Sequence, residues 1–188
     1  MSWNVTALRK ARAIGRLLPS RTRLLTVSYT LELLALAVWI GGLVVIVASV
    51  IPAVFNTLGM EAGGRFLGRV FNGYNFLIAV AIVVLVSSGI WRLYAGSHGL
   101  PEAQLARSEL LLMTTMIGIA AVITLVLAPR TIELQEAAFM ARSKAAQQVA
   151  YDAFFDAHRI VRALYVTNLV LAVALTAVKV QRWLVGTR

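Results

Sequence analysis

The sequence contains no cysteine and few charged residues. Of its 188 residues, 14% are Asp, Glu, Lys or Arg, and two are histidine. The absence of cysteine excludes disulfides, thiolate metal sites and cysteine nucleophiles. Two histidines are too few for a multi-histidine metal cage within one chain, and no Ser/His/Asp arrangement has a catalytic spacing. We therefore expect a protein that is not an enzyme and that carries no cofactor.

The chain is rich in apolar residues. Hydrophobic residues make up 60% and the mean hydropathy is +0.80. Soluble domains are about half apolar and about a quarter charged, so this composition is typical of membrane proteins. The length predicts one integral membrane domain over residues 1–188.

Four apolar segments are long enough to cross a bilayer as helices. They cover about residues 24–55, 70–92, 109–129 and 161–184. Short connections between them predict an all-α, up-down bundle of four transmembrane helices. Residues 131–158 mix charges with good helix formers, which predicts an extramembrane helical hairpin that turns near Ser143 between the third and fourth spans.

Positive charge is concentrated before the first span. The net charge is +10, and the basic segment 1–23 carries Arg9, Lys10, Arg12, Arg16, Arg21 and Arg23. We expect residues 5–18 to form an interfacial amphipathic helix on anionic lipid, ending before Pro19; a disordered basic tail is the alternative. The cations favour cytoplasmic N- and C-termini in a cell inner (plasma) membrane. No nucleic-acid-binding motif accompanies them, so we expect no nucleic-acid partner.

Among the ionisable residues, Glu32 is the strongest candidate for a function within the membrane. It lies about 12 Å into the first span, where a carboxylate is unfavourable unless it is paired, neutral or in contact with water. It could serve as a proton or cation site. The alternative is an ion pair with Lys179, Arg182 or Arg92, which the topology places at a similar depth.

A second set of polar residues belongs to the second and fourth spans. Asn75, Tyr165 and Asn168 are intramembrane polar candidates, and we expect Asn168 to bond across to another helix. His158 is a candidate haem or metal ligand, or a partner for a nearby carboxylate. A two-histidine haem would need His98, which this topology places on the opposite side.

Small residues mark predicted helix contacts. Gly41 and Gly42 lie in the first span, and Ser88 and Gly89 lie in the second. Each pair removes side-chain bulk, so a neighbouring helix can approach closely. Pro52 should kink the end of the first span.

Several of these residues recur in a known family. The pattern consists of Trp39, Gly41, Gly42, Pro52, Phe55, Leu58, Ala62, Gly63, Phe71 and Tyr74, followed by Pro129, Phe155 and His158. It resembles the uncharacterised four-helix membrane proteins related to transmembrane protein 205, and a second, weaker resemblance is to copper-resistance D-like membrane proteins. The first resemblance implies a four-helix membrane architecture and no settled enzymatic activity.

Three functions are compatible with these patterns. The first is a non-enzymatic scaffold or accessory subunit whose partners are other membrane proteins. The second is a small solute or metal-ion transporter, or a tolerance protein, that uses Glu32. The third is haem or metal binding through His158.

Overall fold

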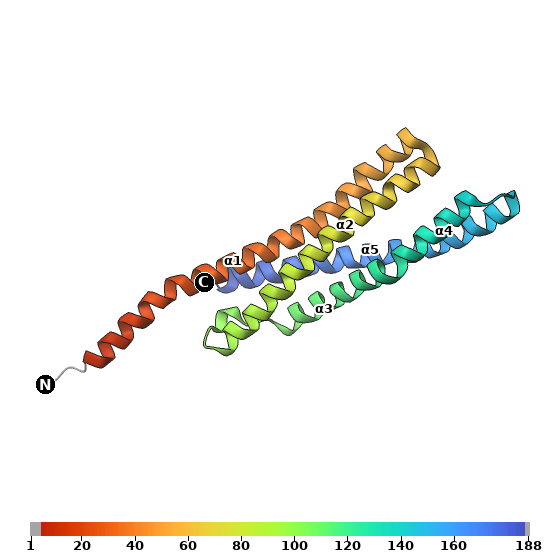
Figure 1. Ribbon diagram of the computed structural model, residues 1–188. Coiled ribbons are helices and arrows are strands. Elements are labelled where there is room, and N and C mark those ends of the chain that lie inside the picture. Colours follow the sequence, from red (N-terminus) through yellow and green to blue (C-terminus); the bar gives the residue numbers. More distant parts are fainter. Residues whose placement is uncertain (1–4, 187–188) are drawn as a thin grey trace.

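The computed structural model describes the backbone of residues 5–186 and the side chains of residues 23–100 and 102–184. Every regular element in this part of the chain is a helix (Figure 1). In order, these are α1 (Val5–Val45), the π-helical turn η1 (Ile46–Val50), α2 (Ile51–Ser97), the 3₁₀ turn η2 (Pro101–Ala103), α3 (Arg107–Val122), the π-helical turn η3 (Ile123–Leu127), α4 (Ala128–Met140) and α5 (Lys144–Gly186).

These elements form three helices that are long and apolar enough to cross a membrane: Arg23–Ser97, Arg107–Met140 and Lys144–Leu184. The first folds back on itself at Gly59, where φ is 71° and ψ is −172°. Only glycine adopts this conformation without strain, because it has no Cβ. As a result α1 and α2 lie side by side as an antiparallel hairpin (Figure 1).

Two prolines follow the two π-helical turns. Pro52 comes two residues after η1, and Pro129 comes two residues after η3. Proline has no N–H, and its ring clashes with the carbonyl four residues earlier, so the regular hydrogen-bond ladder opens locally. A π-helical turn thus precedes Pro52, where a kink was predicted, and a second one precedes Pro129, while the sharp change of direction lies at Gly59.

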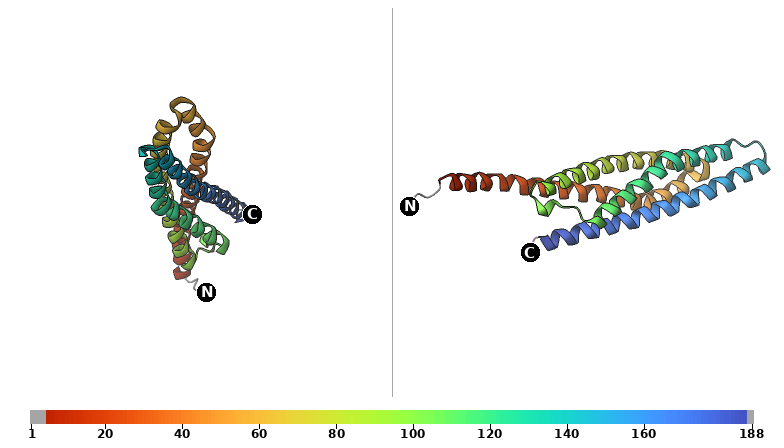
Figure 2. Two further views of the ribbon diagram at one scale, coloured as in Figure 1. Left: turned by 90° about the vertical axis from the view of Figure 1, so that its right-hand side faces the viewer. Right: turned by 90° about the horizontal axis from the view of Figure 1, so that it is seen from below.

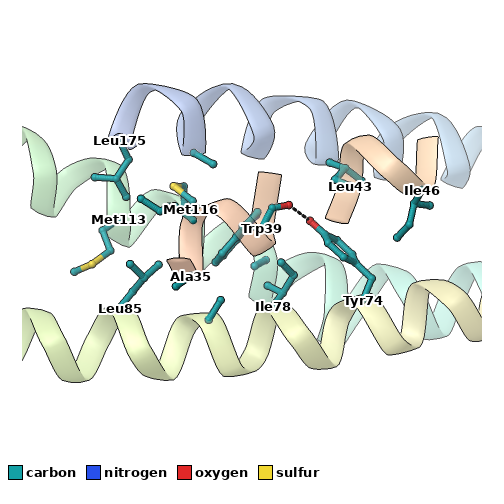
Figure 3. Close-up of a cluster of buried hydrophobic side chains, with 14 residues drawn as sticks. Ala35, Trp39, Leu43, Ile46, Tyr74, Ile78, Leu85, Met113, Met116 and Leu175 are labelled. Carbon is teal, nitrogen blue, oxygen red and sulfur yellow. Dashed lines mark hydrogen bonds between the residues drawn. The ribbon is translucent and has the colours of Figure 1, made fainter. Parts of the chain in front are cut away.

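The core is a narrow seam between the helices. Leu36, Trp39, Leu85, Met116 and Leu175 are fully or almost fully buried in it (Figure 3). The outward side chains are apolar as well. They include Phe76, Leu111 and Leu125, which are 69%, 67% and 75% exposed. An apolar outer surface of this extent is compatible with lipid as the surrounding solvent.

The α1–α2 contact depends on one glycine of the predicted pair. A Cβ on Gly42 would lie 2.9 Å from Cε2 of Tyr74, whereas a Cβ on Gly41 would have no neighbour within 4 Å. Within the described part of the chain, Gly42 is therefore the glycine of the pair that contacts α2, whereas the helical phase of Gly41 turns it away from α2, and its packing role stays a prediction. Gly89 does lie at a contact, where its Cβ would be 3.3 Å from Cε of Met113.

Gly42→Ala is expected to lower the free energy of unfolding by about 1–3 kcal/mol, because overpacking displaces a side chain that is held in place. Tyr74 is buried and donates a hydrogen bond to the Trp39 carbonyl at 2.8 Å, so its ring cannot move freely (Figure 3). Thermal unfolding in detergent measures the change. Gly41→Ala is the matched control and should cause no loss; equal losses in the two variants would contradict this packing.

The N-terminal part of the chain differs from the prediction. We expected a separate interfacial helix that ends before Pro19, but α1 runs without a break from Val5 to Val45 and projects beyond the rest of the bundle (Figure 2). Helix formers on both sides of Pro19 extend the helix past one missing hydrogen bond. At the other end, α4 and α5 are joined by residues 141–143, which confirms the turn predicted near Ser143.

Candidate functional site

Two carboxylates and two cations meet between the helices. Glu32 comes from α1, Arg92 from α2, Glu109 from α3 and Lys179 from α5. Each of these side chains is at most 1% exposed. We call these four residues the charge quartet.

Each cation of the quartet bridges both carboxylates. Lys179 Nζ lies 2.5 Å from Glu32 Oε2 and 2.5 Å from Glu109 Oε1. Arg92 Nη1 lies 2.6 Å from Glu109 Oε1 and 3.0 Å from Glu32 Oε2. The formal charges cancel, which is the condition under which buried ions are tolerated, because each desolvated charge then has an opposite charge in direct contact.

Polar neighbours complete the hydrogen bonding of the carboxylates. Ser88 donates to Glu32 Oε1 and also bonds to Ser28. Arg182, which is partly exposed, donates to Glu109 Oε2 at 2.8 Å and to the Gln104 carbonyl at 2.9 Å. Both carboxylates are thus bound by three side chains each, so neither is left without partners.

Arg92 has a second type of contact, with the side chain of Tyr29. Its Nη2 donates to the Tyr29 hydroxyl at 2.9 Å, and its guanidinium carbon lies 4.4 Å from the centre of the Tyr29 ring. This is a cation–π arrangement. Nε of Arg92 has no hydrogen-bond partner within the described side chains.

Glu32 thus forms the ion pairs that the sequence analysis gave as the alternative to a proton or cation site, and it does so with both Lys179 and Arg92. Glu109 was missed because it was interpreted only as the boundary of the third span. The predicted up-down topology contained a signal for Glu109. It brings the start of the predicted third span to the same end as Glu32, Arg92 and Lys179, where two buried cations need two carboxylates.

The second set of predicted polar residues is partly brought together. Tyr165 donates to Asn75 Oδ1 at 3.0 Å, and Asn168 donates to the Met116 carbonyl at 3.3 Å, which confirms a bond from Asn168 to another helix. All three line a cavity of about 10 Å³ together with Tyr74 and Thr124. That volume is about the minimum for one water molecule, so the cavity is too small for a larger solute.

His158 lies apart from this cavity. Its ring stacks on Phe154, with 5.4 Å between ring centroids, while His98 stacks on Tyr94 at the end of α2. Burial lowers the pKa of His158, and the positive charge of Arg162 lowers it further. Within the side chains described here, no group of three or more His, Asp or Glu residues is placed to hold a metal ion.

Two sets of predicted residues are left: Ser88 and the basic residues of the N-terminal segment. Ser88 belongs to the surroundings of the charge quartet. The side chains of Arg9, Lys10, Arg12 and Arg16 lie outside the described residues.

Comparison with known proteins gives one family. The model of one protein family, whose description is a domain of unknown function (DUF4149), matches residues 34–139. The matched segment includes Arg92 and Glu109 but ends before α5. No curated protein and no solved structure matches the chain. The resemblance to proteins related to transmembrane protein 205 therefore stays a prediction.

Proposed function

This chain belongs to the family defined by that domain of unknown function, and we propose that it is a non-enzymatic integral membrane protein that acts as a scaffold or accessory subunit of a larger membrane complex. The charge quartet is the observation that carries this proposal. It joins α1, α2, α3 and α5 through ions that are already fully paired. Such pairing supports a role in fixing how the helices are arranged rather than in binding a passing ion.

The proposal includes four membrane crossings. The reversal at Gly59 divides the longest apolar helix into two antiparallel segments, and α3 with η3 and α5 supply the other two. The charge quartet then lies near one membrane face, at the same end as the α2–α3 connection. The tips at Gly59 and at residues 141–143 lie on the other face.

The orientation follows from the cations before the first span. They favour a cytoplasmic N-terminus in a cell inner membrane, and four crossings then place the C-terminus on the same side. In this arrangement the basic segment 1–23 would be on the cytoplasmic side, where anionic lipids face the basic residues. The α4–α5 hairpin would extend from the outer face as a surface for partner subunits.

Purification from native membranes tests the proposed function. The tagged full chain, extracted in two mild detergents, should retain the same partner subunits at the same fixed stoichiometry in both. Mass photometry and quantitative mass spectrometry measure the composition. A monodisperse monomer in both detergents, stable and without a partner, would contradict the proposal.

A further inference from the structure

A polar crevice lies between α2 and α4, away from the charge quartet. It has a volume of about 210 Å³, and its walls include Gly64, Gly68, Arg69 and Asn72 from α2 and Ile132 and Gln135 from α4. This is smaller than the roughly 300–1,000 Å³ of pockets that enclose a drug-sized molecule. The crevice therefore fits a small polar group rather than a whole large ligand.

Two glycines explain why the crevice is present. At Gly64 the helices are close, because an added Cβ would lie 2.7 Å from Nε2 of Gln135. One turn later, an added Cβ on Gly68 would have no neighbour within 4 Å. The two helices thus touch at the first glycine and leave open space at the second.

The two arginines of the crevice differ in their partners. Arg65 pairs with Glu136 at 3.2 Å and with Glu61 at 3.5 Å, and its guanidinium lies over the Phe139 ring. Arg69 forms no ion pair within the described side chains, which include 23–100 and 102–184. Arg65 is thus held by two carboxylates, of which Glu136 also lines the crevice, whereas Arg69 has no carboxylate partner among the described side chains, so Arg69 is the cation available to an anion.

We propose that this crevice binds a phosphodiester, with Arg69 as the charged contact. Arginine presents paired N–H donors that match two phosphate oxygens. Asn72 lies three residues after Arg69 on the same face of α2, and Gln135 stands on the opposite wall, so both amides can donate to the remaining oxygens. The crevice thus offers one guanidinium and two neutral amides, and the Glu136 carboxylate that also lines it is held by Arg65 at 3.2 Å. This set fits a group with a single negative charge.

The position of the crevice indicates where the phosphodiester comes from. Arg69 immediately precedes the apolar segment of α2, and Ile132 follows Pro129 by three residues. In the four-crossing arrangement proposed above, this is the level of the phospholipid head groups. A lipid source therefore depends on the proposed topology, whereas the phosphate chemistry of the crevice does not.

Lipid binding to the full chain tests this inference. Delipidated protein in neutral detergent is titrated with phosphatidylglycerol, and bound lipid is counted by native mass spectrometry. Arg69→Gln should weaken binding about tenfold or more, because a charge-assisted contact is lost. Gly68→Leu should weaken it as well by filling the crevice, without removing a charge.

Two further arms make the result decisive. Arg159→Gln removes an exposed cation that pairs with Asp156 outside the crevice, and it should bind like the wild type. Competition with glycerophosphoglycerol, a soluble phosphodiester that is the deacylated form of the same lipid, identifies the source: no competition supports a lipid, and competition that Arg69→Gln abolishes supports a soluble phosphodiester. Unchanged phosphatidylglycerol binding by both Arg69→Gln and Gly68→Leu would overturn the proposal.

Discussion

Glu109→Leu is expected to lower the free energy of unfolding by about 3–5 kcal/mol. The carboxylate of Glu109 contacts Arg92, Lys179 and Arg182. Its removal leaves Lys179 and Arg92 sharing the single carboxylate of Glu32, so the buried site carries an excess positive charge. Leucine fills much of the space, but it cannot offset the desolvation of that charge.

Thermal or denaturant unfolding in detergent measures this effect. Glu133→Leu is the matched control, because it also removes a carboxylate that pairs with an arginine. Both side chains of that pair are largely exposed, at 66% for Arg130 and 68% for Glu133, so the change should be within about 0.5 kcal/mol. Similar losses in the two variants would show that the charge quartet does not hold the helices together.

Removing one cation and one anion together should cost less than removing either alone. Glu32→Leu and Lys179→Met should each destabilise by about 3–5 kcal/mol, because each leaves an unbalanced buried charge. The double variant keeps the Arg92–Glu109 pair at 2.6 Å and restores neutrality. We expect it to be more stable than both single variants. A loss equal to the sum of the two single losses would contradict the neutral-quartet interpretation.

The same double variant separates the two leading functions. If Glu32 only stabilises the fold, the folded double variant should keep its partner subunits at the original stoichiometry. If Glu32 couples transport, any uptake or resistance phenotype should disappear even though the fold is intact. Comparing complex composition with phenotype in one strain gives both results.

Some of the site could be predicted from the sequence because depth in a membrane restricts chemistry. Glu32 is a carboxylate inside an apolar segment, and the topology offers Lys179 and Arg92 at a similar level. The pairing follows from these two facts. Glu109 was not identified, because a charge at the end of an apolar run is also the ordinary sign of a membrane boundary.

Other features depend on relative helix phase, which a single sequence does not contain. Gly41 and Gly42 are adjacent glycines that the sequence alone cannot distinguish, but only Gly42 faces Tyr74. The reversal at Gly59 depends on one backbone conformation among several nearby glycines. The continuity of α1 through Pro19 also runs against the usual effect of proline on a helix.

We propose that the chain crosses the membrane four times, with the tips near Gly59 and Ser143 on one side and the α2–α3 connection on the other. Because the sequence has no cysteine, single cysteines report position without background. In intact cells, Leu58→Cys and Ser143→Cys should react with a membrane-impermeant maleimide, whereas Ser97→Cys should react only after lysis. Reaction of all three cysteines in intact cells would contradict the four-crossing arrangement. So would reaction of only one of Leu58→Cys and Ser143→Cys in intact cells, with the other reacting only after lysis.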